Sequence, residues 1–287
     1  MIKVLKSGLY TSVQDLGRFG QASFGVPMSG VMDMQSAKFA NVLLGNPEHA
    51  AVLEITMVGP ELEFTEATSI CIVGAEMSPK VNGAAVKNNM AINVFKGDRL
   101  TFGRLQKGMR CYLAVLGGVQ TESVLGSRSM YWPVTLQSRL EKGDELKLVE
   151  MKKHSLERHA VVRFDDSYVV SETLEVFEGP EFNELSKEQQ TILFSKTFTI
   201  SNHNSRMAYQ LNETLQNSLN AIITAPVLPG TVQLTPSGQL IVLMRDCQTT
   251  GGYPRVLQLT EASINSLAQK TTGNTIRFRL KPWNLNR

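Results

Sequence analysis

The stretch Thr275-Ile276-Arg277-Phe278-Arg279-Leu280 places an apolar side chain at every second position. This period of two is the pattern of a β-strand with one buried and one exposed face. Further strands are predicted where short apolar or β-branched runs are bounded by Gly, Pro, Asn or Asp: Ser69–Val73, Arg110–Val115, Val169–Phe177, Ala221–Ile223 and Gln239–Met244. Lys-Gly-Asp at 96–98, and again at 142–144, leads into an alternating run as a turn leads into a strand.

Only three segments carry helix signals. Met32–Leu44 ends at Gly45-Asn46-Pro47, the usual order of Gly and Pro past a helix C-terminus. Ser186-Lys187-Glu188-Gln189 is a capping box that opens a short helix to about Phe194. Thr260–Gln269 gathers apolar residues on one helical face. A few short helices among many strands predict a mainly β (α+β) protein with β-barrel architecture, and argue against alternating βαβ layers.

The length of 287 residues suggests one large domain or two ordinary ones. The polar stretch 150–159 (Glu-Met-Lys-Lys-His-Ser-Leu-Glu-Arg-His) is the best candidate for a linker. We therefore expect an N-terminal domain of residues 1–155 and a C-terminal domain of residues 156–287.

Composition indicates which kinds of partner, such as nucleic acid or a membrane, are not expected. Lys and Arg number 29 and Asp and Glu 26, so the net charge is only +3, and nucleic-acid binding through a basic stripe is not expected. No apolar stretch approaches the ~20 residues of a membrane-spanning helix. The three cysteines, Cys71, Cys111 and Cys247, lie in or beside apolar runs and are expected to be small buried side chains. A cytoplasmic protein that binds neither membrane nor nucleic acid fits this composition.

The common catalytic motifs are absent. Gly20 to Gly25 has the glycine spacing of a phosphate loop, but Val26 stands where lysine is required. Neither a Gly-x-Gly-x-x-Gly nor a Gly-x-Ser-x-Gly motif occurs. The four histidines lack the spacing of metal ligands, so no metal site is predicted from them. Met151-Lys152 is followed by Lys153 rather than a second Met, and covalent biotin on Lys152 is not expected.

Two segments concentrate polar residues and glycines. The first runs from Thr11-Ser12-Val13-Gln14-Asp15-Leu16-Gly17-Arg18 to Asp33, ahead of a predicted helix. The second runs from Leu228 to Arg255 and contains Gln248-Thr249-Thr250-Gly251-Gly252-Tyr253-Pro254 between two strand-like runs, 240–244 and 256–259. Glycines permit close backbone approach to a ligand, and free N–H groups near a helix start favour anions. Such clusters also serve as hydrogen-bonded turns, in which Asp and Thr cap backbone groups.

These segments resemble the biotin-dependent carboxyltransferase-like family, also called allophanate hydrolase subunit 2, which includes KipA and the C subunit of 5-oxoprolinase. The matching text begins with residues 11–18 and ends with 228–255. Between them lie four further matches: Ala40-Asn41-Val42-Leu43-Leu44-Gly45-Asn46, Leu125-Gly126-Ser127-Arg128-Ser129, Gly179-Pro180-Glu181-Phe182 and Ser205-Arg206-Met207-Ala208-Tyr209. The resemblance extends from about residue 3 to 280. Ala208 and the segment Tyr131-Trp132-Pro133-Val134 depart from the family pattern.

The resemblance implies two cyclophilin-like β-barrel domains and a companion subunit. It points to the C subunit of an ATP-dependent 5-oxoprolinase, whose partners are a KipI-like protein (the B subunit) and a separate hydrolase (the A subunit). That complex opens the lactam of 5-oxo-L-proline to give L-glutamate, and it implies ATP and Mg²⁺ at the level of the complex. A lactam is a poor electrophile, and phosphorylation of its oxygen creates a good leaving group. We expect little turnover from this chain alone.

Within this family reading, roles can be assigned to the polar residues of the two clusters. Asp15, Arg18 and Asp246 are the candidate catalytic residues: the carboxylates would hold a cation or accept a proton, and the arginine would clamp oxyanions. For Asp15, a structural turn is the alternative. The candidate substrate-binding residues are Gln14, Arg206, Gln248, Thr249, Thr250 and Tyr253.

Two other functions stay open from the sequence. A carboxyltransferase component of a biotin-dependent urea or amide carboxylase would need a carboxylase and a carrier from separate proteins. A KipA-type regulator would bind a KipI-like kinase inhibitor instead of taking part in catalysis.

Overall fold

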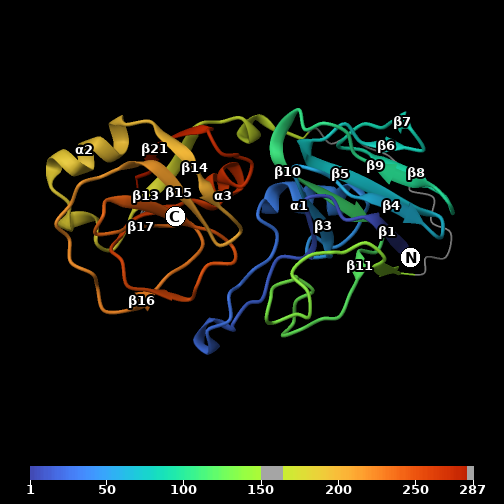
Figure 1. Ribbon diagram of the computed structural model, residues 1–287, viewed down its shortest axis with the longest axis horizontal. Coiled ribbons are helices and arrows are strands. Elements are labelled where there is room, and N and C mark those ends of the chain that lie inside the picture. The colour runs from blue at the N-terminus through green and yellow to red at the C-terminus, as the bar shows by residue number, and fades with distance from the viewer. Residues whose placement is uncertain (150–163, 283–287) are drawn as a thin grey trace. The chain divides into compact units, whose positions relative to one another are not determined.

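The computed structural model describes residues 1–149 and 164–282. The chain divides into two compact units: unit 1 comprises Met1–Phe19 and Ser29–Val169, and unit 2 comprises Gly20–Met28 and Val170–Arg287 (Figure 1). The predicted boundary at residue 155 and the predicted linker lie outside the described residues.

Unit 1 is built from two antiparallel sheets. The seven-stranded sheet has the order β11-β12-β1-β4-β9-β6-β7, and the five-stranded sheet has the order β2-β3-β10-β5-β8. The strands of the first sheet are β1 (Ile2–Lys6), β4 (Glu61–Phe64), β6 (Lys80–Val81), β7 (Ala84–Ala85), β9 (Arg99–Thr101), β11 (Val119–Gln120) and β12 (Glu145–Leu148). Those of the second are β2 (Tyr10–Gln14), β3 (Val52–Thr56), β5 (Thr68–Glu76), β8 (Ala91–Val94) and β10 (Lys107–Val115).

The five-stranded sheet is covered on both faces, and its sequence shows why. Cys111, Leu113 and Val115 of β10 belong to a core shared with the seven-stranded sheet. Tyr112 and Ala114, which point to the opposite face, pack with helix α1 (Met34–Leu43). Side chains alternate between the two faces of a strand, so the sequence of a strand that is covered on both faces is a continuous apolar run. This arrangement places α1 over one face of the sheet (Figure 1).

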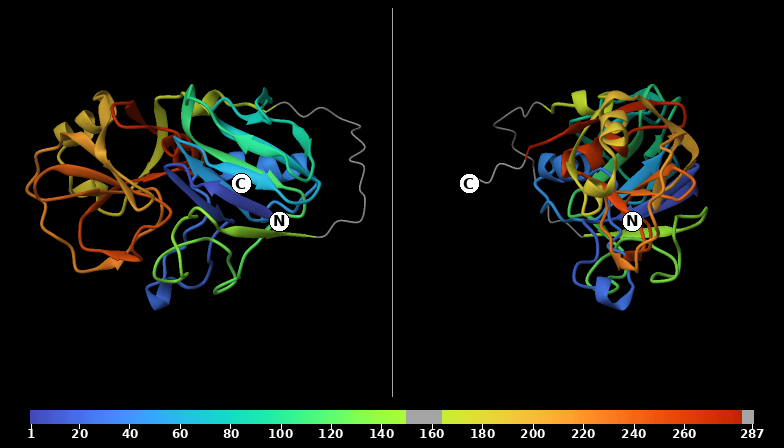
Figure 2. Two further views of the ribbon diagram at one scale, coloured as in Figure 1. Left: turned by 45° about the vertical axis from the view of Figure 1, so that its right-hand side comes forward. Right: turned by 90° about the vertical axis from the view of Figure 1, so that its left-hand side faces the viewer.

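Unit 2 contains a closed barrel with the strand order β13-β20-β17-β18-β15-β14-β21, which Figure 2 shows from two further directions. Its strands are β13 (Thr173–Glu178), β14 (Phe198–Asn204), β15 (Ala208–Thr214), β17 (Thr231–Leu234), β18 (Gln239–Leu243), β20 (Arg255–Leu259) and β21 (Thr275–Leu280). A separate two-stranded sheet joins β16 (Ala225–Pro226) to β19 (Thr250–Gly251). Closure removes the exposed strand edges that an open sheet would present to other chains.

Two α-helices belong to unit 2, α2 (Lys187–Ser195) and α3 (Glu261–Leu267). The predicted capping box is present at α2: the Ser186 side chain accepts from the Gln189 N–H, and the Gln189 side chain accepts from the Ser186 N–H. Three short 3₁₀ helices complete the elements: η1 (Ala22–Phe24), η2 (Ser167–Val169) and η3 (Phe182–Glu184). Over residues 1–149 and 164–282 the protein is mainly β, with three α-helices, as the sequence predicts.

One predicted strand begins too early, and another is wrong. The run Val169–Phe177 begins in the 3₁₀ helix η2, and its strand β13 starts only at Thr173. The run Ala221–Ile223 forms no strand, because Ile223 is 95% exposed and the backbone joins a sheet only at Ala225. Apolar, β-branched composition favours a strand, but the strand also needs a partner and a buried face. None of the helices formed by the described residues is long and apolar enough to cross a membrane.

The three cysteines are buried free thiols, as predicted. Burial raises the pKa of the Cys111 thiol, and burial followed by the charge of Asp246 raises the pKa of Cys247 to about 12. Both thiols are therefore protonated at neutral pH and lack the thiolate that a nucleophile requires.

Candidate functional site

The Asp15 carboxylate is the centre of a hydrogen-bonded loop in unit 1. Its Oδ1 accepts from the Gly17 N–H (2.9 Å) and from the hydroxyls of Ser127 (2.6 Å) and Ser129 (2.7 Å). Its Oδ2 accepts from the Arg128 N–H at 2.6 Å. The backbone of Asp15 also bonds on both sides, because its N–H donates to the Ser129 hydroxyl and its carbonyl accepts from a backbone N–H. Asp15 therefore joins the end of β2 to segment 127–129.

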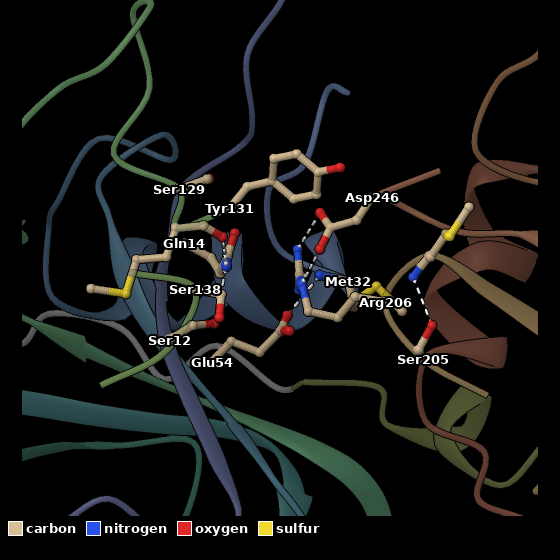
Figure 3. Close-up of polar contacts among 12 residues, drawn as sticks. Ser12, Gln14, Met32, Glu54, Ser129, Tyr131, Ser138, Ser205, Arg206 and Asp246 are labelled. Carbon is tan, nitrogen blue, oxygen red and sulfur yellow. Dashed lines mark hydrogen bonds and ion pairs between the residues drawn. The ribbon is translucent and has the colours of Figure 1, made fainter. Parts of the chain in front are cut away.

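Arg18 and Gln14 bind the same distant segment. The Arg18 side chain is 2% exposed, and its guanidinium donates to the carbonyls of Val124 and Ser129. The Gln14 amide is fully buried and donates to the Ser12 hydroxyl at 3.0 Å and to the Met130 carbonyl at 3.1 Å. Figure 3 shows the Gln14 side chain beside Ser12. Three predicted site residues are thus brought together, and each holds loop 124–130 in place.

A second polar network of unit 1 escaped prediction. Glu54 lies in the middle of β3 and is fully buried. Its Oε2 accepts from the Met32 N–H at 2.7 Å (Figure 3). The same oxygen accepts from the Tyr112 hydroxyl at 2.9 Å, and the Arg110 guanidinium lies 3.8 Å from Oε1. The signal in the sequence is a carboxylate within the apolar strand Val-Leu-Glu-Ile. Carboxylates are almost never fully buried unless they are paired.

The network continues into the N-terminus of α1. The Tyr112 hydroxyl accepts from the Asp33 N–H at 2.8 Å. Asp33 caps the helix by accepting from the Ser36 N–H, and its Oδ2 also accepts from the Tyr168 hydroxyl at 2.7 Å. Burial, followed by the charge of Glu54, raises the pKa of Tyr112; burial, followed by the charge of Asp33, raises the pKa of Tyr168. Both phenols are therefore proton donors at neutral pH.

Unit 2 brings together Arg206 and Asp246, two predicted site residues 40 positions apart. The guanidinium donates from Nε to Oδ2 at 2.8 Å and from Nη2 to Oδ1 at 3.1 Å. A backbone hydrogen bond joins the same two residues, because the Asp246 N–H donates to the Arg206 carbonyl. Figure 3 shows the two groups face to face. This fork-to-fork pair fixes the plane of the guanidinium.

The predicted glutamine–threonine loop begins at Gln248, two residues after Asp246. Its backbone is anchored by the pairing of β19 with β16 and by the Val227 N–H, which donates to the Thr249 carbonyl. Thr250 and Tyr253 are exposed, and Gln248 and Thr249 are half-buried. The Gln248 Nε2 lies 3.5 Å from Oε1 of Gln233, a buried residue of β17 for which the sequence predicts no role. The loop is therefore a fixed segment with several accessible polar side chains.

Lys270, just after α3, is a further titratable group that sequence reasoning missed. Lys270 is 3% exposed. Burial lowers the pKa of its ammonium to about 8, and the negative charge of Glu172 opposes that shift. A lysine with such a pKa exchanges its proton close to physiological pH.

Arg255, at the far end of the loop, is paired with Glu181. The guanidinium donates to both carboxylate oxygens, at 3.0 and 2.7 Å, and the Arg255 N–H donates to Oε2 at 2.8 Å. The hydrogen bonds from Arg255 hold the pKa of Glu181 below its usual value, against the opposing effect of burial.

This lowered pKa predicts a pH dependence for unit 2. The pair contributes stability above the unfolded carboxyl pKa, about 4.3, and loses it as pH falls through the lower folded value. We expect Glu181→Gln to cost about 1–2 kcal/mol at pH 7. The difference from wild type should shrink below about pH 4, as measured by urea unfolding at a series of pH values. A difference that stays constant down to pH 3 would contradict this role.

Among the described residues, no group of three or more His, Cys, Asp or Glu side chains is placed to hold a metal ion. The carboxylates of Asp15 and Asp246, which the sequence offers as cation ligands, already accept hydrogen bonds from protein donors. These two carboxylates are therefore already engaged within the protein and do not fit the role of Mg²⁺ ligands.

Comparison with known proteins places these clusters in a family. The family described as "Carboxyltransferase domain, subdomain A and B" matches residues 24–280. The C subunit of the 5-oxoprolinase of Escherichia coli is 35% identical over 97% of this chain and 90% of its own length. The corresponding protein of Haemophilus influenzae is 30% identical over the same shares.

Two solved structures share the fold. The crystal structure of TTHA0988 superposes with a TM-score of 0.86 at 28% identity, over 97% of this chain and 55% of that chain. The crystal structure of the K. lactis urea amidolyase gives a TM-score of 0.83 at 27% identity, over 96% of this chain and 18% of that chain. The chain thus corresponds to about half of the first protein and to a small part of the second. From its full-length sequence matches, this chain belongs to the carboxyltransferase domain (subdomain A and B) family.

Proposed function

We propose that this chain is the C subunit of an ATP-dependent 5-oxoprolinase, which opens 5-oxo-L-proline to L-glutamate. The observation that carries the proposal is the pair of full-length matches to proteins named as the C subunit of 5-oxoprolinase. The name of those relatives refers to one subunit of several. As partners we propose a KipI-like protein, the B subunit, together with a separate hydrolase, the A subunit.

ATP supplies the driving force in this proposal. Hydrolysis of a lactam has a high barrier because the amide is a weak electrophile, and transfer of a phosphoryl group to its oxygen creates a leaving group. Because the carboxylates of Asp15 and Asp246 are already bonded within the protein, we propose that the metal-bound nucleotide binds to another subunit. What this chain contributes is a set of fixed polar groups, among them the guanidinium of Arg206 and the amides of loop 248–253, that bind and orient a small polar substrate.

Reconstitution tests the proposal. We expect no detectable turnover from this chain alone and ATP-dependent release of glutamate from 5-oxoproline when the hydrolase and the KipI-like protein are added. Glutamate is measured with a coupled dehydrogenase assay, and a mixture lacking only this chain is the control. Full activity from this chain alone would contradict the proposed subunit role, and the absence of activity from all three proteins together would refute the proposed reaction.

A second candidate is the transfer of a carboxyl group from a biotin carrier. The likeness to a urea amidolyase structure supports this candidate. Lys152, the position considered for covalent biotin, lies outside the described residues. Fixation of labelled bicarbonate by this chain, a biotin carboxylase and a biotinylated carrier, in the absence of 5-oxoproline, would favour this reaction over lactam opening.

A further inference from the structure

Gln248 carries a buried acceptor atom that has no partner among the described residues. Its Oε1 is inaccessible to solvent and accepts no hydrogen bond from residues 1–149 or 164–282. A buried amide oxygen without a donor costs free energy that native structures rarely leave uncompensated. Such an atom, in a loop whose neighbouring side chains are accessible, is a candidate acceptor for a ligand that donates a hydrogen bond.

The direction of the Gln248 amide is fixed by a chain of three groups. The Tyr253 carbonyl can only accept, and the Nε2 of Gln233 lies 3.4 Å from it. The Oε1 of Gln233 therefore faces away from that carbonyl and accepts from the Nε2 of Gln248. This leaves the Oε1 of Gln248 as the free end of the chain. Both distances are long, so the order rests on which atoms can donate rather than on the strength of either bond.

Gly251 leaves room for this arrangement. A Cβ atom at position 251 would lie 2.4 Å from the Nε2 of Gln233, whereas the next nearest atoms are 3.4 Å away. The backbone of Gly251 does not adopt the left-handed conformation, so an alanine is acceptable there in every respect except this contact. The missing side chain thus provides the space in which the amide of Gln233 orients Gln248.

We propose that Gln248 accepts a hydrogen bond from the N–H of a cyclic amide, and that Gln233 is the positioning residue that aims it. The inference rests on the proposed function, because the ring N–H is the one amide donor of 5-oxoproline. It adds a specificity determinant: the site distinguishes a lactam from a ring of the same size and charge that lacks the N–H. Sites built to bond a polar group reject analogues that lack it far more strongly than apolar pockets do.

The matched probe is 3-oxocyclopentane-1-carboxylate, in which a CH₂ replaces the ring N–H while the carbonyl and carboxylate are retained. The experiment uses the complex reconstituted from all three subunits and measures KM for 5-oxoproline and the inhibition constant of the ketone. In wild type we expect the ketone to bind at least about tenfold more weakly than the lactam. In Gln248→Leu, the KM for the lactam should rise about tenfold while the ketone constant changes less than about twofold.

Further variants distinguish the positioning role of Gln233 from the hydrogen bond that Gln248 accepts. Gln233→Leu and Gly251→Ala leave the acceptor in place but release its orientation, so the lactam preference should fall in both, by less than in Gln248→Leu. Gln248→Glu keeps acceptor oxygens and should retain more of the preference than the leucine variant does. Gln216→Leu, at an exposed glutamine of the same unit, is the control and should match wild type. If these residues had a purely structural role, the KM for the lactam and the inhibition constant of the ketone would change by the same factor.

The outcomes are distinct. If the wild-type complex shows no turnover of 5-oxoproline, the proposed function fails and the inference falls with it. If wild type turns over and the ratio of the two constants is the same in Gln248→Leu, the inference is wrong and the proposed function stands. If the ratio of the ketone constant to the lactam KM falls to about one in Gln248→Leu and falls partly in Gly251→Ala, Gln248 accepts a hydrogen bond from the ring N–H.

Discussion

Replacing Glu54 by leucine is expected to lower the free energy of unfolding by about 3–5 kcal/mol, because two buried donors lose their acceptor and a buried guanidinium loses a neighbouring carboxylate. Arg110 is 2% exposed and lies on the neighbouring strand, so water cannot take the place of the lost carboxylate. The Met32 N–H and the Tyr112 hydroxyl lose their acceptor at the same time. Denaturant unfolding followed by far-ultraviolet circular dichroism measures the effect.

The double variant Glu54→Leu with Arg110→Met is the control for this expectation. Replacing both members of a buried ion pair by apolar side chains is often close to neutral, so the double variant should recover much of the stability that the single variant loses. If the two substitutions are instead additive, the interaction between Glu54 and Arg110 is not the source of the effect.

Asp15→Ala is expected to destabilise the protein by about 3–4 kcal/mol, because four donors lose one acceptor group. The donors come from Gly17 and from segment 127–129, more than 110 residues away in sequence. Ser127→Ala removes a single donor and should cost about 1 kcal/mol. Thermal unfolding of the purified chain distinguishes the two variants.

The same variant decides between the two roles that the sequence leaves open for Asp15. If Asp15→Ala unfolds at the wild-type temperature but abolishes turnover of the assembled complex, the residue is catalytic and the structural role is wrong. A parallel loss of stability and of activity, both partly recovered at lower temperature, is the result expected for a residue that fixes a loop.

Local signals in the sequence predicted local structure well. The capping box at Ser186 and the alternation of Thr275–Leu280 depend on residues within one or two turns of each other, and both elements are observed. The run Ala221–Ile223 has strand composition, but pairing in a sheet begins only at Ala225, and composition alone cannot reveal where pairing begins. Pairings such as that of β10 with β5 join segments far apart in the chain and required the structure.

The candidate site shows the same division. The polar clusters around Asp15 and Gln248 stand out in the sequence because hydroxyls, amides and glycines gather there. Which atoms they contact depends on distant residues, such as Ser127 for Asp15 and Gln233 for Gln248. Glu54 was missed because one carboxylate inside an apolar strand is a weak signal until its partner strand supplies Tyr112 and Arg110.

The assignment of residues Gly20–Met28 to unit 2 limits how this protein can be cut into fragments for expression. The chain leaves unit 1 after Phe19, contributes nine residues to unit 2 and returns at Ser29 before it crosses again at Val170. No single cut in the gene therefore yields both units with all their residues. Expression of the fragment that starts at residue 170 would therefore give the barrel of unit 2 without the nine residues that the N-terminal part of the chain contributes to that unit.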